Sequence, residues 1–507
     1  MPQLARNITV TYVSRLAAIA AAFALFPFIA GEVGIEQYGV YLLVYGLTNF
    51  FSTDLGIGSS VIRYVSAAEL EGDPAELDRV VSTSMAFFVA LAAGMAIIFV
   101  VVTALVWGSL NIPADQRHTA TLLLPIVGVG FVILGPPLSV FRNVLAGLQR
   151  YDLVSGFALV QVILRVVLTV PLLLAGFGVI AVAAVEAVAF LSVGLLCAIK
   201  VYRMRPALRV SPRLVSRSLL REMAPYSIQV FLMTVSALVI LQADNIIIGL
   251  VLPVAAVALY TAAYRLYQVC REVTQSIFVP LVSDAARAHA TSDHRRVREL
   301  LLRGTRLANT LLISLAVPML VLAGPVLSVW AGAQFAGVAV VAQILLAGLL
   351  VNNLHVIAIP ILMGAGRLRV YARLHVAWAV SNIVLSVVLA SGPLGLKGIA
   401  LGTAIPVVLL EPLYVREVLR HTGTSWRAFA DQVILRSFGV AVPAALVLVA
   451  VAHWLHPRSV LAIVAVGALH LVVLWACYLA VNADDRSLVR GVVGRLRRAR
   501  TPAAQAA

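Results

Sequence analysis

Long apolar runs, separated by short polar segments, recur along the whole chain. Each run is continuous over about 20 residues, which is long enough to cross a bilayer as a helix, and lacks the alternation of a β-barrel strand. In lipid, only helices and closed barrels satisfy their backbone polar groups. The pattern predicts fourteen membrane-spanning helices, at about 9–30, 38–64, 81–108, 119–141, 153–175, 178–199, 223–250, 255–280, 305–326, 337–363, 371–391, 396–415, 434–454 and 459–481.

The composition agrees with a chain whose solvent is lipid. Of the 507 residues, 62% are hydrophobic and 12% are charged, whereas soluble domains have roughly 25% charged residues. The mean hydropathy is +1.00, and a soluble fold would leave too much of this apolar surface in water. We therefore predict an all-α polytopic membrane protein. Its first span should be retained, because no convincing small-residue cleavage site accompanies it.

The basic residues indicate the orientation of the spans. With the N-terminus in the cytoplasm, thirty basic residues fall in inside segments and three, Arg117, Lys397 and Arg458, fall outside. Cytoplasmic loops carry the excess of Lys and Arg, so we predict a bacterial cytoplasmic membrane protein with both termini inside. Because the net charge of +16 is spread over short loops, it does not indicate nucleic acid as a partner.

Weak internal similarity divides the chain into two halves. Tyr41 and Tyr45 recur 219 positions later as Tyr260 and Tyr264, and three further short matches lie 219 to 221 positions apart. This offset spans six helices, as in transporters built from parallel repeats. The predicted organisation is an N-terminal lobe of six helices (1–199), a basic cytoplasmic linker (200–222), a C-terminal lobe of six helices (223–430), helices 13 and 14 (431–481) and a basic cytoplasmic tail (482–507).

The second and eighth predicted spans each carry a polar, aromatic face. In the second span this face consists of Tyr41, Tyr45, Thr48, Asn49, Ser52, Gly56, Ser59 and Arg63. In the eighth span it consists of Tyr260, Thr261, Tyr264, Arg265, Tyr267, Gln268, Arg271, Glu272 and Gln275. The two spans hold equivalent places in the repeat, so the faces predict a central water-accessible cavity between the lobes. The same side chains would also suit hydrogen bonds between neighbouring helices.

Charged residues at membrane depth are costly and usually meet a partner or a ligand. Arginines outnumber carboxylates in the predicted cavity, which favours an anionic ligand, although Arg165 could instead pair with Glu186. The predicted substrate-binding residues are Arg15, Arg165, Arg265, Arg271, Tyr45, Asn49, Tyr264 and Gln268. The candidates for ion coupling are Asp244, Glu186 and Glu411, each of which also has a purely structural interpretation.

No enzyme or cofactor motif is present. The chain has no Walker motif, no H-E-x-x-H and no G-x-S-x-G. Cys197, Cys270 and Cys477 lie in apolar runs without the spacing of a zinc site or a disulfide framework. We therefore expect a protein that is not an enzyme and that needs no cofactor or metal.

Two stretches resemble a known family. Residues 37–66, QYGVYLLVYGLTNFFSTDLGIGSSVIRYVS, combine Tyr-Gly at the start of a span, a Gly-containing break and a final Arg. Residues 243–264, ADNIIIGLVLPVAAVALYTAAY, place an aspartate before a Tyr-containing helix. Both resemble the oligosaccharide (Wzx-type) flippases of the multidrug/oligosaccharidyl-lipid/polysaccharide exporter superfamily. The length, the two six-helix halves and the basic linker extend the resemblance over the chain.

The resemblance implies a V-shaped pair of lobes that move an undecaprenyl-pyrophosphate-linked oligosaccharide unit across the membrane by alternating access, for polysaccharide biosynthesis. The partners implied are this lipid-linked oligosaccharide, membrane lipids and the polysaccharide polymerase machinery. The basic cavities of such proteins correspond here, by helix position, to Arg15, Arg165, Arg265 and Arg271. Fourteen helices resemble the lipid II flippases, in which the extra pair lines a groove for the lipid tail.

Three other functions were weighed. A lipid II flippase stays open as an alternative. A cation-coupled multidrug exporter of the same superfamily would need an acidic, aromatic cavity. An embedded polymerase or glycosyltransferase would usually need a sizeable polar domain, for which the short loops leave no room.

We expect a variant with both Arg265→Ala and Arg271→Ala to lose flipping of the lipid-linked oligosaccharide, because the cavity then lacks two of its four predicted cations. The variant should still fold and insert in the membrane. Leaflet-selective labelling measures flipping, and the size-exclusion profile of the purified protein reports folding. Unimpaired flipping would remove this site assignment.

Overall fold

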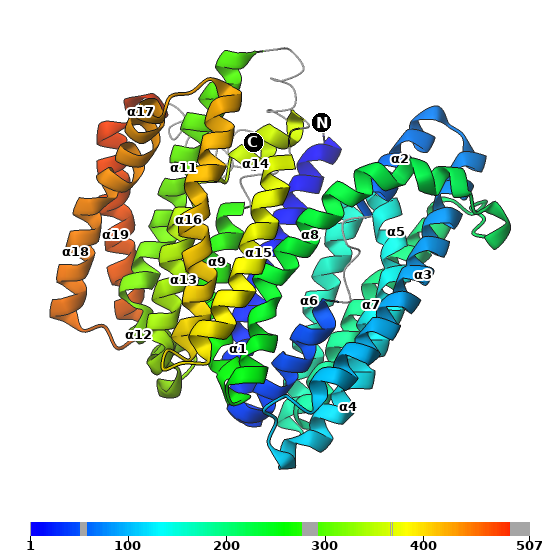
Figure 1. Cartoon of the computed structure of the whole chain (residues 1–507), viewed down its shortest axis with the longest axis horizontal. Coiled ribbons are helices and arrows are strands. Elements are labelled where there is room, and N and C mark those ends of the chain that lie inside the picture. The colour runs from blue at the N-terminus through cyan, green and yellow to red at the C-terminus, as the bar shows by residue number, and fades with distance from the viewer. Residues whose placement is uncertain (1, 51–57, 276–292, 366, 368, 487–507) are drawn as a thin grey trace, which may run out of the picture. The chain divides into compact units, whose positions relative to one another are not determined.

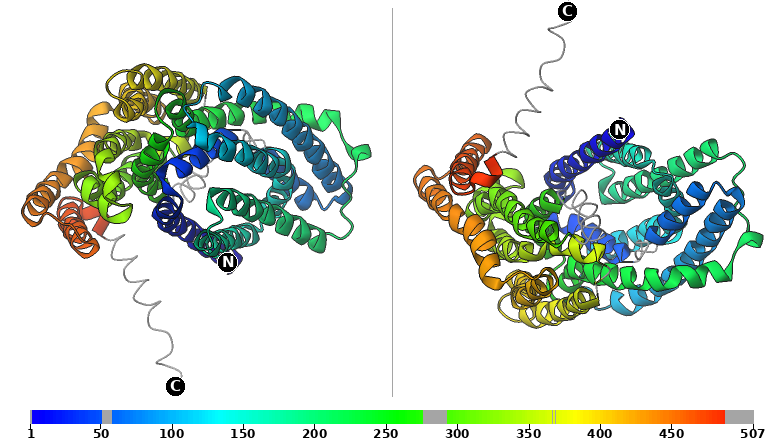
Figure 2. Two further views of the ribbon diagram at one scale, coloured as in Figure 1. Left: turned by 90° about the horizontal axis from the view of Figure 1, so that it is seen from below. Right: turned by 90° about the horizontal axis from the view of Figure 1, so that it is seen from above.

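The computed structural model describes residues 2–50, 58–275, 293–365, 367 and 369–486, with the backbone alone at 2–9, 49, 224–233, 241 and 364. Within these ranges the chain consists of helices and short loops without a strand, which confirms the all-α prediction. Figure 2 looks along the helices from either end and shows that they run side by side as bundles.

The contacts between residues gather the chain into two compact units. The first unit comprises Met1–Arg265 and Tyr371–Pro406, and the second comprises Leu266–Val370 and Val407–Ala507. This grouping follows spatial contact and not chain order, so the predicted boundaries of lobes, linker and tail stay predictions. Two helices, α9 (Ala255–Gln275) and α16 (Leu396–Thr422), each begin in the first unit and end in the second.

The first unit holds most of the long helices (Figure 1). Besides the first parts of α9 and α16, it contains α1 (Pro2–Asn49), α2 (Gly58–Glu71), α3 (Pro74–Trp107), α4 (Arg117–Val127), the π-helix η2 (Gly128–Leu134), α5 (Gly135–Gly147), α6 (Tyr151–Leu174), α7 (Gly178–Met204), α8 (Arg217–Val251) and nearly all of α15 (Arg369–Ala390).

The second unit contains α11 (His294–Val321), α12 (Ala323–Trp330), α13 (Ala339–Asn352), the short 3-10 turn η5 (Asn353–His355), α14 (Ala358–Gly364), α17 (Trp426–Phe429), the π-helix η6 (Ala430–Gly439), α18 (Val440–Leu455) and α19 (Val460–Val481).

The described residues include eleven helices that are long and apolar enough to cross a membrane, or twelve if the bent pair Thr234–Ile240 and Gln242–Val251 is one span. The two other predicted spans, 38–64 and 255–280, are helical where they are described. The first continues α1 beyond a kink at Gly34, whose φ of 79° interrupts the helix, and the second is α9, whose charged residues lower its hydropathy. The multi-pass helical fold is confirmed, and the number fourteen stays a prediction.

The predicted linker is fastened to the first unit at the start of α3. Asp73 caps α3 by accepting hydrogen bonds from the backbone N–H groups of Ala75 and Glu76, at 2.9 and 3.1 Å. The linker backbone then donates from Arg209 to Asp78 at 3.0 Å. A backbone N–H group of the basic linker thus donates to an acidic side chain near the start of α3. This contact holds the linker along α3.

The α15–α16 hairpin depends on two glycines at a close helix crossing. A Cβ at Gly398 would lie 2.5 Å from the carbonyl carbon of Leu389, and one at Gly402 would lie 2.5 Å from the backbone nitrogen of Ser386. Glycines four residues apart allow backbones to approach in this way in membranes. The approach brings the middle of α15 against α16, where part of the candidate site lies.

The last two helices belong to the second unit and pack on α11. Ile313 of α11 contacts Ala441 and Ala444 of α18 and Leu474 of α19 in one buried apolar cluster. The predicted extra helices therefore form part of a packed core. Their proposed role as a groove for a lipid tail stays a prediction.

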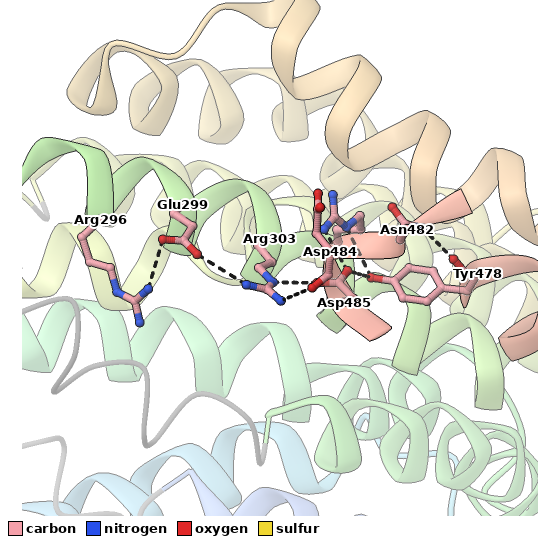
Figure 3. A network of polar contacts seen from close by, with 8 residues as sticks. Arg296, Glu299, Arg303, Tyr478, Asn482, Asp484 and Asp485 are labelled. Carbon is pink, nitrogen blue, oxygen red and sulfur yellow. Dashed lines mark hydrogen bonds and ion pairs between the residues drawn. The ribbon is translucent and has the colours of Figure 1, made fainter. Parts of the chain in front are cut away.

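A buried carboxylate anchors the end of α19 to α11 (Figure 3). Asp485, whose side chain is fully buried, accepts from Arg303 Nε at 2.6 Å, from an Arg306 guanidinium nitrogen at 2.8 Å and from the Tyr478 hydroxyl at 2.5 Å. Burial by itself would raise the pKa of Asp485. The Tyr478 hydroxyl and the two guanidinium groups outweigh that effect and hold the pKa below its ordinary value.

We expect Asp485→Asn to destabilise the protein by on the order of 3 kcal/mol at neutral pH, because the buried Arg306 loses its counter-charge. A carboxyl with a lowered folded-state pKa stabilises above its unfolded pKa of about 3.9, and this stabilisation is lost as the pH falls below that value. The difference between wild type and variant in thermal unfolding should therefore stay constant from pH 6 to about pH 5 and shrink as the pH falls through about 3.9 toward the folded-state pKa. Asp484→Asn is the matched control, because Asp484 is exposed and the substitution keeps the backbone carbonyl that accepts from Arg303. A difference that is independent of pH would contradict this account.

Candidate functional site

A column of stacked tyrosines lines one face of the second half of α1. Tyr38, Tyr41 and Tyr45 follow each other at helical spacing, so their rings lie above one another. The ring centroids are 6.0 Å apart between Tyr38 and Tyr41 and 5.7 Å apart between Tyr41 and Tyr45. Phe131 of η2 continues the column edge-on against Tyr45 at 5.6 Å. Tyr38 and Tyr41 are buried and Tyr45 is half-buried, so the column is a wall of the first unit.

An ion pair between α6 and α7 lies beside this column. Arg165 reaches both oxygens of Glu186, with Nε at 2.7 Å from one and a terminal nitrogen at 2.6 Å from the other. The charges of both residues act on the tyrosines, and the charge of Arg265 acts on Tyr38, Tyr45 and Glu186. The first unit thus brings together four predicted site residues: Arg165, Glu186, Arg265 and Tyr45. The structure also decides that Arg165 and Glu186 pair with each other.

A second polar group of the first unit surrounds Asp244 on α8. Its Oδ2 accepts from the Tyr260 hydroxyl and from the Thr403 hydroxyl at 3.2 Å, and Asn382 donates to Thr403 at 2.9 Å. Within the described part of the chain, Asp244 has no ion pair, and its Oδ1 has no hydrogen-bond partner. Asp244 is only 3% exposed. Such an oxygen in a dry site can accept a proton or contribute to binding a small cation.

The third candidate carboxylate belongs to the second unit. Glu411 on α16 lies 2.8 Å from Nδ1 of His355, and the imidazole stacks on Tyr414 with ring centroids 4.3 Å apart. All three side chains are buried. His355 lies in η5, where the helical run from α13 to α14 is interrupted, so Glu411 has a titratable partner at a break in a helix.

The other predicted site residues are more dispersed. Arg15 is exposed on α1, and no hydrogen bond or ion pair joins it to the tyrosine column among the described residues. Tyr264 stacks on Tyr260 with ring centroids 6.2 Å apart. Gln268 and Arg271 are half-buried on α9 beyond Arg265, in the second unit. The side chain of Asn49 and all of Ser52 and Gly56 lie outside the described residues.

Sequence reasoning did not select four residues that complete these groups: Tyr38, Asn382, Thr403 and His355. Tyr38 lies in the stretch that carried the family resemblance, one turn before Tyr41, and its spacing was a usable signal. Asn382, Thr403 and His355 are isolated polar residues within predicted spans. Their partners lie on other helices, so no periodicity connects them.

The arrangement offers binding chemistry. Among the described residues, no group of three or more His, Cys, Asp or Glu side chains could hold a metal ion. Tyr45 is the partly exposed ring of the tyrosine column, and Arg165, Arg265 and Glu186 together leave a net positive charge beside it. Such a surface suits a ligand that combines an anionic group with sugar rings or apolar chains.

Comparisons with known proteins agree with the geometry. The family model described as "Polysaccharide biosynthesis protein" matches residues 4–286, which is more than half of the chain. The protein "Uncharacterized membrane protein EpsK" of Bacillus subtilis (strain 168) is 26% identical over 430 residues, which cover 80% of this chain and 81% of that protein.

Two kinds of solved structure share the fold. A lipid II flippase MurJ in an inward closed conformation aligns with a TM-score of 0.70 and 14% identity, over 95% of this chain and 99% of that chain. An inward-facing multidrug resistance MATE family transporter of the MOP superfamily aligns with a TM-score of 0.60 and 16% identity, over 82% of this chain and 94% of that chain. The predicted resemblance to the multidrug/oligosaccharidyl-lipid/polysaccharide exporter superfamily is confirmed.

Proposed function

The chain belongs to the polysaccharide biosynthesis protein family, and from this premise we propose that it flips an undecaprenyl-pyrophosphate-linked oligosaccharide unit across the cytoplasmic membrane by alternating access. In this proposal it is a transporter and not an enzyme. Its partners are the lipid-linked oligosaccharide, the surrounding lipids and the polysaccharide polymerase machinery. Both termini are proposed to be cytoplasmic.

The tyrosine column beside the arginines carries the proposal. Sugar rings present apolar C–H faces and polar edges, and a tyrosine offers an aromatic ring and a hydroxyl that complement both; Tyr45 is the partly exposed member of the column. A multidrug exporter for cations would need an acidic surface, whereas here one carboxylate faces two guanidinium groups. The surface therefore favours an anionic glycolipid over a cationic drug.

Arg265 is the proposed contact for the pyrophosphate. Arg165 already directs its guanidinium at Glu186, which occupies the fork that would otherwise bind phosphate. The charge of Arg265 reaches the tyrosines as well as Glu186. In this proposal Arg165 holds Glu186 in place beside the tyrosine column, and the positive charge of Arg265 binds the pyrophosphate of the ligand.

Asp244 is the proposed residue for ion coupling. Glu186 and Glu411 each have a cationic or titratable partner, whereas the groups that donate to Asp244 among the described residues, two hydroxyls and the Asn382 amide, are neutral. A proton or a sodium ion at Asp244 would supply the missing charge. Because Tyr260 connects Asp244 to the stacked Tyr264, the occupancy of this site could alter the start of α9.

Lipid II flipping is the second candidate. The solved lipid II flippase aligns with 95% of this chain, whereas the MATE transporter aligns with 82% of it. This likeness concerns the fold, and it makes lipid II the intermediate to monitor beside the oligosaccharide.

Deletion of the gene in its host should cause one pyrophosphate-linked repeat unit to accumulate on the inner leaflet, because its route outward is lost. Mass spectrometry with leaflet-selective labelling identifies the lipid, and re-expression of the wild-type protein is the control. Accumulation of lipid II would favour the second candidate. Absence of any intermediate, together with new sensitivity to cationic drugs, would overturn the proposal.

Asp244→Asn should uncouple transport from its driving ion while leaving the protein folded, because asparagine keeps the hydrogen-bonding shape but removes the charge. We expect flipping in proteoliposomes to lose its dependence on a proton or sodium gradient. Asp115→Asn, which changes an exposed carboxylate, is the matched control. A variant that responds to both gradients as the wild type does would exclude Asp244 as the coupling residue.

A further inference from the structure

The second half of α1 and the end of α8 lie in close contact through glycines on both helices. A Cβ at Gly39 would lie 2.4 Å from the carbonyl oxygen of Val254, just after α8, and one at Gly46 would lie 3.2 Å from the Asn245 side chain. Glycines let membrane helices approach to this distance, because no side chain separates the backbones. A Cβ at Gly39 would meet backbone, so even alanine there requires the two segments to move apart.

Between these two positions, α8 supplies the glycine and α1 the side chain. The Leu43 side chain would lie 2.6 Å from a Cβ at Gly249, and Leu43 is only 2% exposed. Leu43 follows Gly39 by four residues and precedes Gly46 by three, so all three lie on one face of α1. The two segments therefore meet along one antiparallel contact, which we call the glycine seam: Gly39, Leu43, Gly46, Asn245, Gly249 and Val254.

A short loop after α3 fastens the end of α8 beside the seam. Asn111 donates its backbone N–H to the carbonyl of Gly249 at 2.8 Å and its side-chain amide to the carbonyl of Leu250 at 3.0 Å. Both carbonyls are among the last four of the helix, which have no partner within it. Leu110 and Ile112, on either side of Asn111, are each 6% exposed, so buried side chains hold the loop in place.

The predicted topology places the seam and the loop at the outside face of the membrane. Gly39 lies at the outside start of the predicted span 38–64, and the segments 109–118 and 251–254 are outside loops. By the predicted boundaries, α1 and α3 belong to the N-terminal lobe and this part of α8 to the C-terminal lobe. In alternating access, one repeat rocks against the other around the substrate site. Contacts that join the two lobes on the outside therefore have to break when the substrate leaves there.

We propose that the glycine seam and the Asn111 loop form the outer closure of this transporter. They hold the outer ends of α1 and α8 together while the substrate enters from the cytoplasm, and they part to release its headgroup outside. The inference rests on the alternating access of the proposed function and assigns residues to one of its steps. Asn111 acts as a positioning residue, because it contacts the end of α8 and not the candidate substrate site. Its hydrogen bonds can break and form again in each cycle, since water replaces them at small net cost.

Labelling from the outside tests whether the seam parts. The reporter chain is the full-length protein with Leu43→Cys and with its three native cysteines replaced by alanine: Cys197, Cys270 and Cys477. A membrane-impermeant maleimide should reach position 43 only when the seam is open. Gly39→Ala should raise the labelling rate several-fold, because its Cβ forces the segments apart. Gly31→Ala, on the same helix with no atom within 4 Å of the added Cβ, is the matched control and should leave the rate unchanged.

Asn111→Ala provides a second variant that keeps the seam intact. Asn111 is exposed, so the variant should fold, and its size-exclusion profile checks this. Loss of the side-chain hydrogen bond should raise the labelling rate by roughly twofold to fivefold. Unchanged labelling in both Gly39→Ala and Asn111→Ala would overturn the proposal. If Gly39→Ala does not insert in the membrane, Asn111→Ala alone decides.

A reversible crosslink tests whether transport needs the opening. Cysteines introduced by Asn111→Cys and Leu250→Cys are bridged with a short bis-methanethiosulfonate in the chain without native cysteines. The bridged protein should lose flipping of the lipid-linked oligosaccharide, and reduction should restore it. The control pair, Thr11→Cys and Ser155→Cys, joins α1 to α6 within the predicted N-terminal lobe, where the two hydroxyls lie 2.8 Å apart. Bridging this pair should leave flipping unchanged.

The two readouts separate failure of the closure from failure of the proposed function. Full flipping by the protein bridged between positions 111 and 250 would overturn the closure. If the unbridged protein flips no oligosaccharide at all, the proposed function is wrong, and the labelling of position 43 alone decides on the closure.

Discussion

A polar or charged group within a bilayer has to find its partner inside the protein, because lipid offers none. Much of this chain's internal organisation follows from that constraint. Arg165 meets Glu186 between α6 and α7, and Glu411 meets His355 beside Tyr414. These pairs join helices that are distant in sequence, so they hold specific helix neighbours together as well as balancing charge.

Asp244 is a buried carboxylate whose described partners are all neutral. One of its oxygens has no hydrogen-bond partner among the described residues. In a membrane such atoms are tolerated where an ion, water or a ligand reaches them. Asp244 faces hydroxyl groups and the Asn382 amide, an environment that suits a small cation or a proton.

The tyrosine column and the arginines find their partners inside the protein in another way. Tyr38, Tyr41 and Tyr45 stack on one another, so aromatic contacts pack their rings within the first unit. Arg165 is held by Glu186, so the column has a fixed wall beside it. At the far end of the chain, Asp485 performs a purely structural task by joining α19 to α11 through two arginines. Charged pairs therefore join helices in both units, α6 to α7 in the first and α11 to the end of α19 in the second.

The sequence by itself determined the solvent, the all-helical class and most helix positions, because apolar runs of bilayer length have few alternatives. It also selected Arg165, Glu186, Arg265, Tyr45 and Asp244 as candidates, since charge and aromatic spacing are visible along one helix. Only the tertiary structure decided that Arg165 pairs with Glu186, that Thr403 and Asn382 complete the group at Asp244, and that Asp485 is a buried anchor. Apart from the Tyr478–Asp485 hydrogen bond, which spans 7 positions, these contacts join residues from 21 to 182 positions apart, and helix periodicity carries no information across such distances.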